Sequence, residues 1–112
     1  QQGWLAALRD ERIGGALAAI HRAPERRWDV RSLAQEAGMS RSAFSAKFSR
    51  LVGEPAMQYL TRWRMQLARA RLRTTTEPLA ALADRFGYGS EAAFCKAFKR
   101  TFGEPPGHVR EH

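Results

Sequence analysis

Few of the residues that mark secreted, membrane or β-sheet proteins occur in this chain. Its single cysteine, Cys95, excludes an internal disulfide and a cysteine-based zinc site, and fits a reducing cytoplasm. Only three Val and two Ile stand against 19 Ala in 112 residues, a balance that favours helices over strands. No apolar run approaches the roughly 20 residues that would cross a bilayer. The sequence therefore predicts an all-α fold with no membrane span.

Signatures of catalysis are also missing. His21, His108 and His112 lie far from one another and show no metal-ligand spacing, either among themselves or toward Cys95. Neither a Gly-rich phosphate loop nor a nucleophile elbow occurs. We therefore expect a protein that is not an enzyme and that has no catalytic residues, no metal site and no cofactor.

Basic side chains are plentiful. The 19 Lys and Arg outnumber 11 acidic residues, giving a net charge of +8, shared by both halves of the chain. Such a balance points first to nucleic acid and second to an anionic membrane surface. Membrane binding would need a long helix with exposed aromatics, whereas the aromatics here recur at positions typical of a core. The alternative that stays open is a basic helical protein-interaction module, which salt-sensitive DNA binding would distinguish.

The chain contains an internal repeat. When Ser40–Pro55 is placed over Ser90–Pro105, eight of the sixteen positions are identical. Allowing one inserted residue in the turn extends the match back to Gly38 and Gly87. Each copy predicts a short helix, a glycine turn, a serine N-cap and a second helix, which is the helix-turn-helix layout. The inward stripes of the two second helices are predicted to be Phe44, Phe48 and Leu51, and Phe94, Phe98 and Phe102.

Four segments follow from these patterns. Residues 1–9, with Trp4, Leu5 and Leu8, are expected to form a tether from a missing N-terminal domain, because the chain starts at Gln1 without Met. Residues 10–54 form the first helix-turn-helix subdomain, with Asp10 as a helix cap. Residues 55–73 form a connector helix of roughly 27 Å, with Trp63 on a buried stripe. Residues 74–112 form the second subdomain, with Thr76 capping its first helix.

With the phenylalanines inward, helical geometry turns a second set of side chains outward. These outward residues are Arg41, Ser42, Ser45, Ala46 and Ser49 in the first copy, and Glu91, Ala92, Cys95, Lys96 and Lys99 in the second.

The motifs resemble those of a known family. The first copy resembles the first half of an AraC/XylS-type DNA-binding domain, and the second copy resembles its second half. The residues that carry the first resemblance are Leu33-Ala34, Gly38-Met39-Ser40, Phe44-Ser45, Phe48 and Gly53-Glu54-Pro55. Those that carry the second are Leu82-Ala83, Gly87-Tyr88, Ser90, Phe94, Phe98-Lys99-Arg100 and Phe102-Gly103. The resemblance implies a cytoplasmic bacterial transcription regulator, usually an activator. It implies sequence-specific binding of double-stranded DNA, with two recognition helices in successive major-groove segments. It also implies an N-terminal effector-binding domain, absent from this chain, and RNA polymerase as a partner.

The resemblance also assigns roles to the outward residues. The base-contacting positions of the family fall on Arg41, Ser42, Ser45, Ala46, Glu91, Ala92, Cys95 and Lys96. Phosphate contacts are expected from Ser40, Ser49, Arg50, Ser90, Lys99 and Arg100, near the ends of the two helices. Because the two outward faces differ, we expect an asymmetric DNA site of about 16–20 base pairs with two unrelated boxes.

Overall fold

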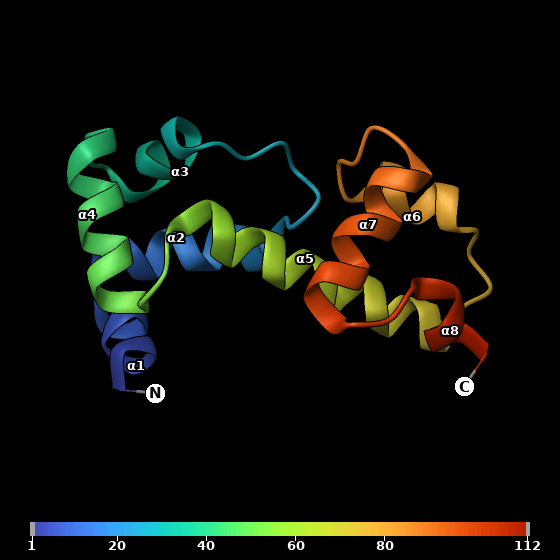
Figure 1. Cartoon of the computed structure of the whole chain (residues 1–112). Helices are drawn as coiled ribbons and strands as arrows, with labels where there is room; N and C mark the ends of the chain where they lie inside the picture. The colour runs from blue at the N-terminus through green and yellow to red at the C-terminus, as the bar shows by residue number, and fades with distance from the viewer. Residues whose placement is uncertain (1, 112) are drawn as a thin grey trace. The chain divides into compact units, whose positions relative to one another are not determined.

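The computed structural model describes the backbone of residues 2–111 and the side chains of residues 5–110. Throughout this range the regular structure is helical, which confirms the predicted all-α class (Figure 1). The helices are α1 (Gln2–Arg9), α2 (Glu11–Arg22), α3 (Val30–Ala37), α4 (Arg41–Val52), α5 (Ala56–Thr74), α6 (Leu79–Arg85), α7 (Glu91–Phe102) and α8 (Pro106–Glu111). They form two compact units, Gln1–Thr61 and Arg62–His112, and the boundary falls inside α5. The predicted connector is thus a continuous helix whose two parts belong to different units.

The core of the first unit forms around α2. Its Ile13, Leu17 and Ile20 are fully buried, as the amphipathic spacing of this helix requires. Phe44 and Phe48 from α4 are also fully buried, as are Leu33 of α3 and Leu60 of α5. The first part of α5 therefore closes the unit that contains the first predicted helix-turn-helix.

The second unit has a core of its own. The later part of α5 supplies Met65, Ala68 and Leu72 to a single buried cluster. The other members are Leu82, Ala83, Phe86, Phe94, Phe98 and Val109, from α6 to α8. Trp63, which was predicted to be buried on the connector stripe, is only half-buried.

The sharp turn inside each helix-turn-helix depends on a left-handed glycine. Gly38 has φ of 68° and Gly87 has φ of 84°, values that strain any side chain with a Cβ atom. In both turns the following residue donates back into the preceding helix: Met39 N–H bonds Ala34 C=O at 3.0 Å, and Tyr88 N–H bonds Ala83 C=O at 2.8 Å. The repeat seen in the sequence therefore extends to the hydrogen bonds that set the angle between the two helices.

Three of the four predicted helix N-caps are present in the structure, and the fourth prediction is wrong. Asp10, Ser40 and Ser90 accept backbone N–H groups at the starts of α2, α4 and α7. Thr76, however, does not cap the following helix, since α6 begins at Leu79 after Pro78. A proline disfavours helical backbone at the residue before it, so Glu77 cannot belong to the first turn.

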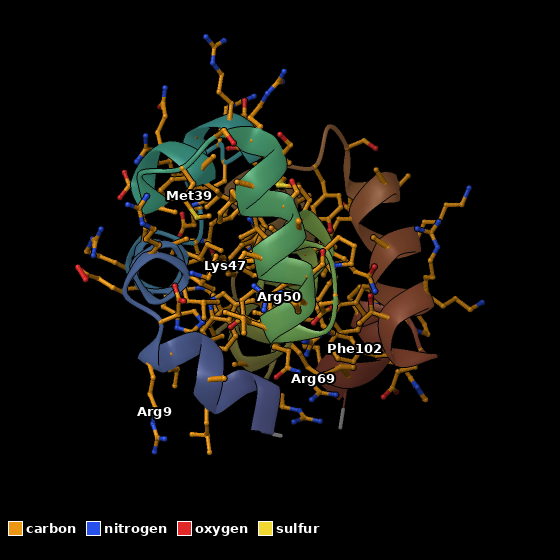
Figure 2. All side chains as sticks on the ribbon, turned by 90° about the vertical axis from the view of Figure 1, so that its left-hand side faces the viewer. Arg9, Met39, Lys47, Arg50, Arg69 and Phe102 are labelled. Atoms are coloured by element: carbon orange, nitrogen blue, oxygen red, sulfur yellow. The ribbon has the colours of Figure 1, made fainter. Side chains whose placement is uncertain are left out.

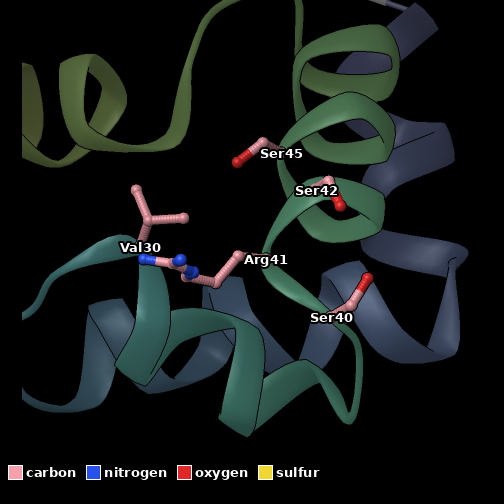
Figure 3. A pocket seen from close by; sticks show the side chains of 5 residues that line it. All are labelled: Val30, Ser40, Arg41, Ser42 and Ser45. Carbon is pink, nitrogen blue, oxygen red and sulfur yellow. The ribbon is translucent and has the colours of Figure 1, made fainter.

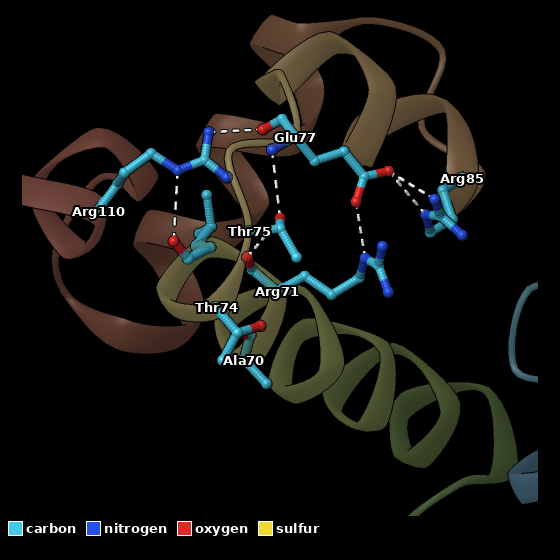
Figure 4. Close-up of polar contacts among 8 residues, drawn as sticks. Ala70, Arg71, Thr74, Thr75, Glu77, Arg85 and Arg110 are labelled. Atoms are coloured by element: carbon cyan, nitrogen blue, oxygen red, sulfur yellow. Dashed lines mark hydrogen bonds and ion pairs between the residues drawn. The ribbon is translucent and has the colours of Figure 1, made fainter.

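Glu77 instead ties the second unit together (Figure 4). Its carboxylate accepts from Arg71 Nε at 2.7 Å and from Arg85 Nε at 3.1 Å, so it bridges α5 and α6. Its backbone carbonyl accepts from Arg110 of α8, which also bonds the carbonyl of Leu72. The guanidinium of Arg85, and then that of Arg71, hold the pKa of Glu77 below its usual range.

The segment expected to be a tether forms helix α1. Ala7 is fully buried, and the helix packs against α4 and α2 (Figure 1). Leu5 and Leu8 remain exposed on its other side. Trp4 lies outside the side chains that the structure describes.

Candidate nucleic-acid interface

Aromatic contacts hold α4 and α7 in place. On α4, the ring centroids of Phe44 and Phe48 are 5.5 Å apart, and Phe48 meets Tyr59 of α5 edge-on at 5.9 Å. On α7, the Phe94 and Phe98 rings are 5.9 Å apart, and those of Phe98 and Phe102 are 4.7 Å apart. These rings fix which face of each helix is buried, and hence which face is left for a ligand.

The support of α4 continues into α2. Tyr59 Oη lies 2.7 Å from His21 Nε2, so a hydrogen bond joins α5 to the end of α2 behind the phenylalanines. Partial burial lowers the pKa of His21 below its ordinary value, because desolvation disfavours the imidazolium.

The outward face of α4 carries the predicted first set of base-contacting residues. Arg41, Ser42 and Ala46 are exposed, and Ser45 is half-buried. Arg41, Ser42 and Ser45 line an open hollow together with Ser40 and Val30 (Figure 3). In this view the guanidinium group of Arg41 lies beside Val30, and Ser45 faces the same hollow. Small side chains there leave room for a base edge to approach the helix.

The outward face of α7 has the same pattern of exposure. Glu91, Ala92 and Lys96 are exposed, and Cys95, at the position equivalent to Ser45, is half-buried. Burial, and secondarily the charge of Glu91, raises the pKa of the Cys95 thiol. Cys95 therefore behaves as a neutral, weakly polar side chain at neutral pH.

The predicted phosphate contacts flank these faces. Arg50, Lys99 and Arg100 are exposed, whereas Ser49 is half-buried. Ser40 and Ser90 are exposed, and their hydroxyl oxygens accept from Ala43 N–H at 3.2 Å and Ala93 N–H at 3.0 Å. A hydroxyl that accepts a cap bond keeps its own proton for donation, so both serines can still bind an anionic oxygen.

Sequence reasoning missed three residues. Val30 adds an apolar wall to the hollow beside α4, and its equivalent in the repeat is Leu79. Lys47 lies on α4, but its Nζ is 2.7 Å from Asp10 Oδ2, so its charge is directed into the protein (Figure 2). Arg69 places its guanidinium 4.2 Å from the centre of the Phe102 ring, at the end of α7. The position of Lys47 beside Phe48 shows that it lies away from the outward residues of α4, but it does not identify Asp10 as its partner.

Other kinds of site find no support in the described part of the chain. Among residues 2–111, no helix is both long and apolar enough to span a membrane. The same residues contain no group of three or more His, Cys, Asp or Glu that could bind a metal ion.

Comparison with known proteins identifies the class. The helix-turn-helix domain family matches residues 33–112. A putative AraC-like transcription regulator of Streptomyces lividans is 48% identical over 98% of this chain and 36% of its own length. The chain belongs to the AraC-type helix-turn-helix family. It spans about a third of the length of the curated relatives it matches.

Two solved structures share the fold. An AraC-type regulator from Chromobacterium violaceum superimposes with a TM-score of 0.83 over 89% of both chains, at 20% identity. The DNA-binding domain of AdpA, a global transcriptional factor solved in complex with a target DNA, is 30% identical, with a TM-score of 0.79 over 91% of both chains.

Proposed function

We propose that this chain is the part of a bacterial transcription regulator that binds double-stranded DNA sequence-specifically, with α4 and α7 placed in successive segments of the major groove. The observation that carries the proposal is the repeated surface of these two helices. Each keeps two phenylalanines buried and presents small and charged side chains at equivalent positions, beside exposed cations. The likeness to the AdpA domain, which was solved with DNA, supports the same conclusion.

The chemistry of the two faces suggests separate tasks. Arg41, Ser42, Ser45 and Ala46 on α4, and Glu91, Ala92, Cys95 and Lys96 on α7, are proposed to contact base edges. A lysine favours guanine, a glutamate favours the amino group of cytosine, and an alanine can meet a thymine methyl. Ser40, Ser49, Arg50, Ser90, Lys99 and Arg100 are proposed to bind phosphates, which sets the register on the duplex without selecting a sequence.

The proposal also covers the longer regulator to which this chain would belong. Because the relatives are nearly three times as long as this chain, we expect an effector-binding domain N-terminal to α1 and RNA polymerase as a further partner. The proposed place of action is the cytoplasm, and no catalytic step is assigned to the chain.

Selection of bound sites from random duplex DNA tests the proposal directly. We expect one asymmetric consensus with two unrelated boxes, because the outward faces of α4 and α7 differ in every proposed base contact. Binding to that site should fall steeply with salt. For about four to eight phosphate contacts, log K against log salt has a slope on the order of −4 to −7.

Two substitutions in α7 distinguish a base contact from a phosphate contact. Lys96→Ala should relax the preference at one position of the site, while Arg100→Ala should weaken all duplexes about equally. A flat salt response with no enriched sequence would contradict DNA binding and favour the protein-interaction module.

A further inference from the structure

Helix α1 has no counterpart in the second unit. The two units share a supporting helix, then a turn-linked pair: α2, α3 and α4 in the first, and the later part of α5, α6 and α7 in the second. Among residues 2–111, the first unit alone has an additional helix ahead of this set. That helix packs against α4, the proposed recognition helix, with Ala7 fully buried.

One carboxylate connects the α1–α2 junction to α4. Asp10 follows α1 directly, and its Oδ1 accepts the N–H groups of Arg12 at 3.0 Å and Ile13 at 2.9 Å, which caps α2. Its Oδ2 lies 2.7 Å from Lys47 Nζ, in the middle of α4. The two carboxylate oxygens therefore have different partners: Oδ1 caps the N-terminus of α2, and Oδ2 pairs with a lysine of the proposed recognition helix.

The angle between α1 and α2 depends on a glycine. A Cβ atom at Gly14 would lie 2.8 Å from the backbone carbonyl oxygen of Leu8, closer than such atoms approach. A Cβ atom at neighbouring Gly15 would lie 3.8 Å from the Glu36 carbonyl, which is ordinary contact. Glycine is among the least favourable residues in a helix interior, and at Gly14 the close passage of α1 explains its presence.

We propose that α1 and Asp10 position the first recognition helix, so that the Asp10–Lys47 ion pair and the α1 packing set how α4 is presented to DNA. This inference rests on the proposed function and adds to it. Asp10 and Lys47 are positioning residues: the ammonium group of Lys47 is held by Asp10, and the pair acts on DNA only through the placement of α4. The contact of α7 with DNA should be independent of both, because the second unit has no equivalent helix.

Substitutions at the junction separate this role from simple capping. Asparagine is as good an N-cap as aspartate, so Asp10→Asn keeps the start of α2 and removes only the charge that pairs with Lys47. Lys47→Gln removes the positive charge of the ion pair, whereas Lys47→Arg keeps a positive charge at this position. Gly14→Ala displaces α1, and Gly15→Ala is its control, because the same methyl group is added one residue away without a clash.

The readout compares the two boxes of the selected site. The 112-residue chain and each variant are titrated with the full site and with sites scrambled in one box, after melting curves confirm folding. For Asp10→Asn and Lys47→Gln we expect a two- to fivefold loss of affinity, about what a modest ion pair contributes. For Gly14→Ala we expect about tenfold, comparable to one base contact. The loss should disappear when the first box is scrambled, and Lys47→Arg and Gly15→Ala should bind as the parent does.

A second measurement needs no DNA. Amide hydrogen exchange of the free chain should show faster exchange in α4 for Gly14→Ala and Asp10→Asn, and unchanged exchange in α7. Equal losses at both boxes, additive effects of Asp10→Asn and Lys47→Gln, or unchanged α4 exchange would each overturn the inference. Failure of the parent chain to select any sequence would instead overturn the proposed function, and the exchange result would still decide whether α1 supports α4.

Discussion

Replacing Phe98 with alanine should unfold the second unit and leave the first unit folded. Phe98 is fully buried, and its ring packs between Phe94 and Phe102 at centroid distances of 5.9 and 4.7 Å. Truncating such a residue costs about 3–5 kcal/mol. A unit of about 50 residues, at roughly 0.05–0.15 kcal/mol per residue, has only about 2.5–7.5 kcal/mol of stability. The loss is therefore comparable to everything that keeps this unit folded.

Hydrogen exchange followed by mass spectrometry measures the outcome unit by unit. In Phe98→Ala, peptides from α6 and α7 should lose protection, while peptides from α2 and α4 keep theirs. Phe102→Ala is the matched control: this residue is only half-buried, with Arg69 over its ring, so its removal should lower the melting temperature by less. Equal loss of protection in both units would refute two separately stabilised cores, and unchanged melting would refute the packing argument for Phe98.

The remaining predictions concern titration and reactivity. Because burial lowers the pKa of His21, the unfolded chain binds more protons than the folded one below about pH 6.5. Stability in urea should therefore fall as the pH drops from 7 toward 5, and His21→Gln should flatten this dependence. Glu77 has a lowered pKa, so its contribution is present at neutral pH and is lost on acidification below about pH 4; Glu77→Gln should lower the melting temperature at pH 7 more than at pH 3. The raised pKa of Cys95 predicts slow alkylation at pH 8, and bound DNA should slow it further if α7 lies in the groove.

Sequence reasoning succeeded where structure is determined locally. The glycines at 38 and 87 end their helices because few other residues tolerate a left-handed backbone, and serines 40 and 90 cap because a hydroxyl there reaches the N–H three residues on. The outward faces of α4 and α7 followed from the phenylalanine spacing. Such features depend on a few neighbouring residues, so one sequence is enough to predict them.

The features that escaped prediction depend on partners distant in the sequence. Nothing near Lys47 shows that its ammonium group meets Asp10, 37 positions earlier. Glycine is unfavourable inside a helix, and the presence of Gly14 is explained only by the Leu8 carbonyl oxygen that passes close to it in the folded chain. Thr76 looked like a cap because serine and threonine usually are, yet Pro78 prevents the helix from starting there.

As proposed recognition helices, α4 and α7 show how one scaffold could serve two different base sequences. The proposed base-contacting positions of α4 and α7 have the same burial, with Ser45 and Cys95 half-buried and the other three of each set exposed. The turns that set the helix angles also match in their hydrogen bonds. Only the outward chemistry differs, with Arg41 and Ala46 in one helix where Glu91 and Lys96 stand in the other. Because a cation and a carboxylate select opposite partners on a base edge, we propose that the duplicated fold fixes where each box is contacted and that the substituted residues determine which bases each box contains.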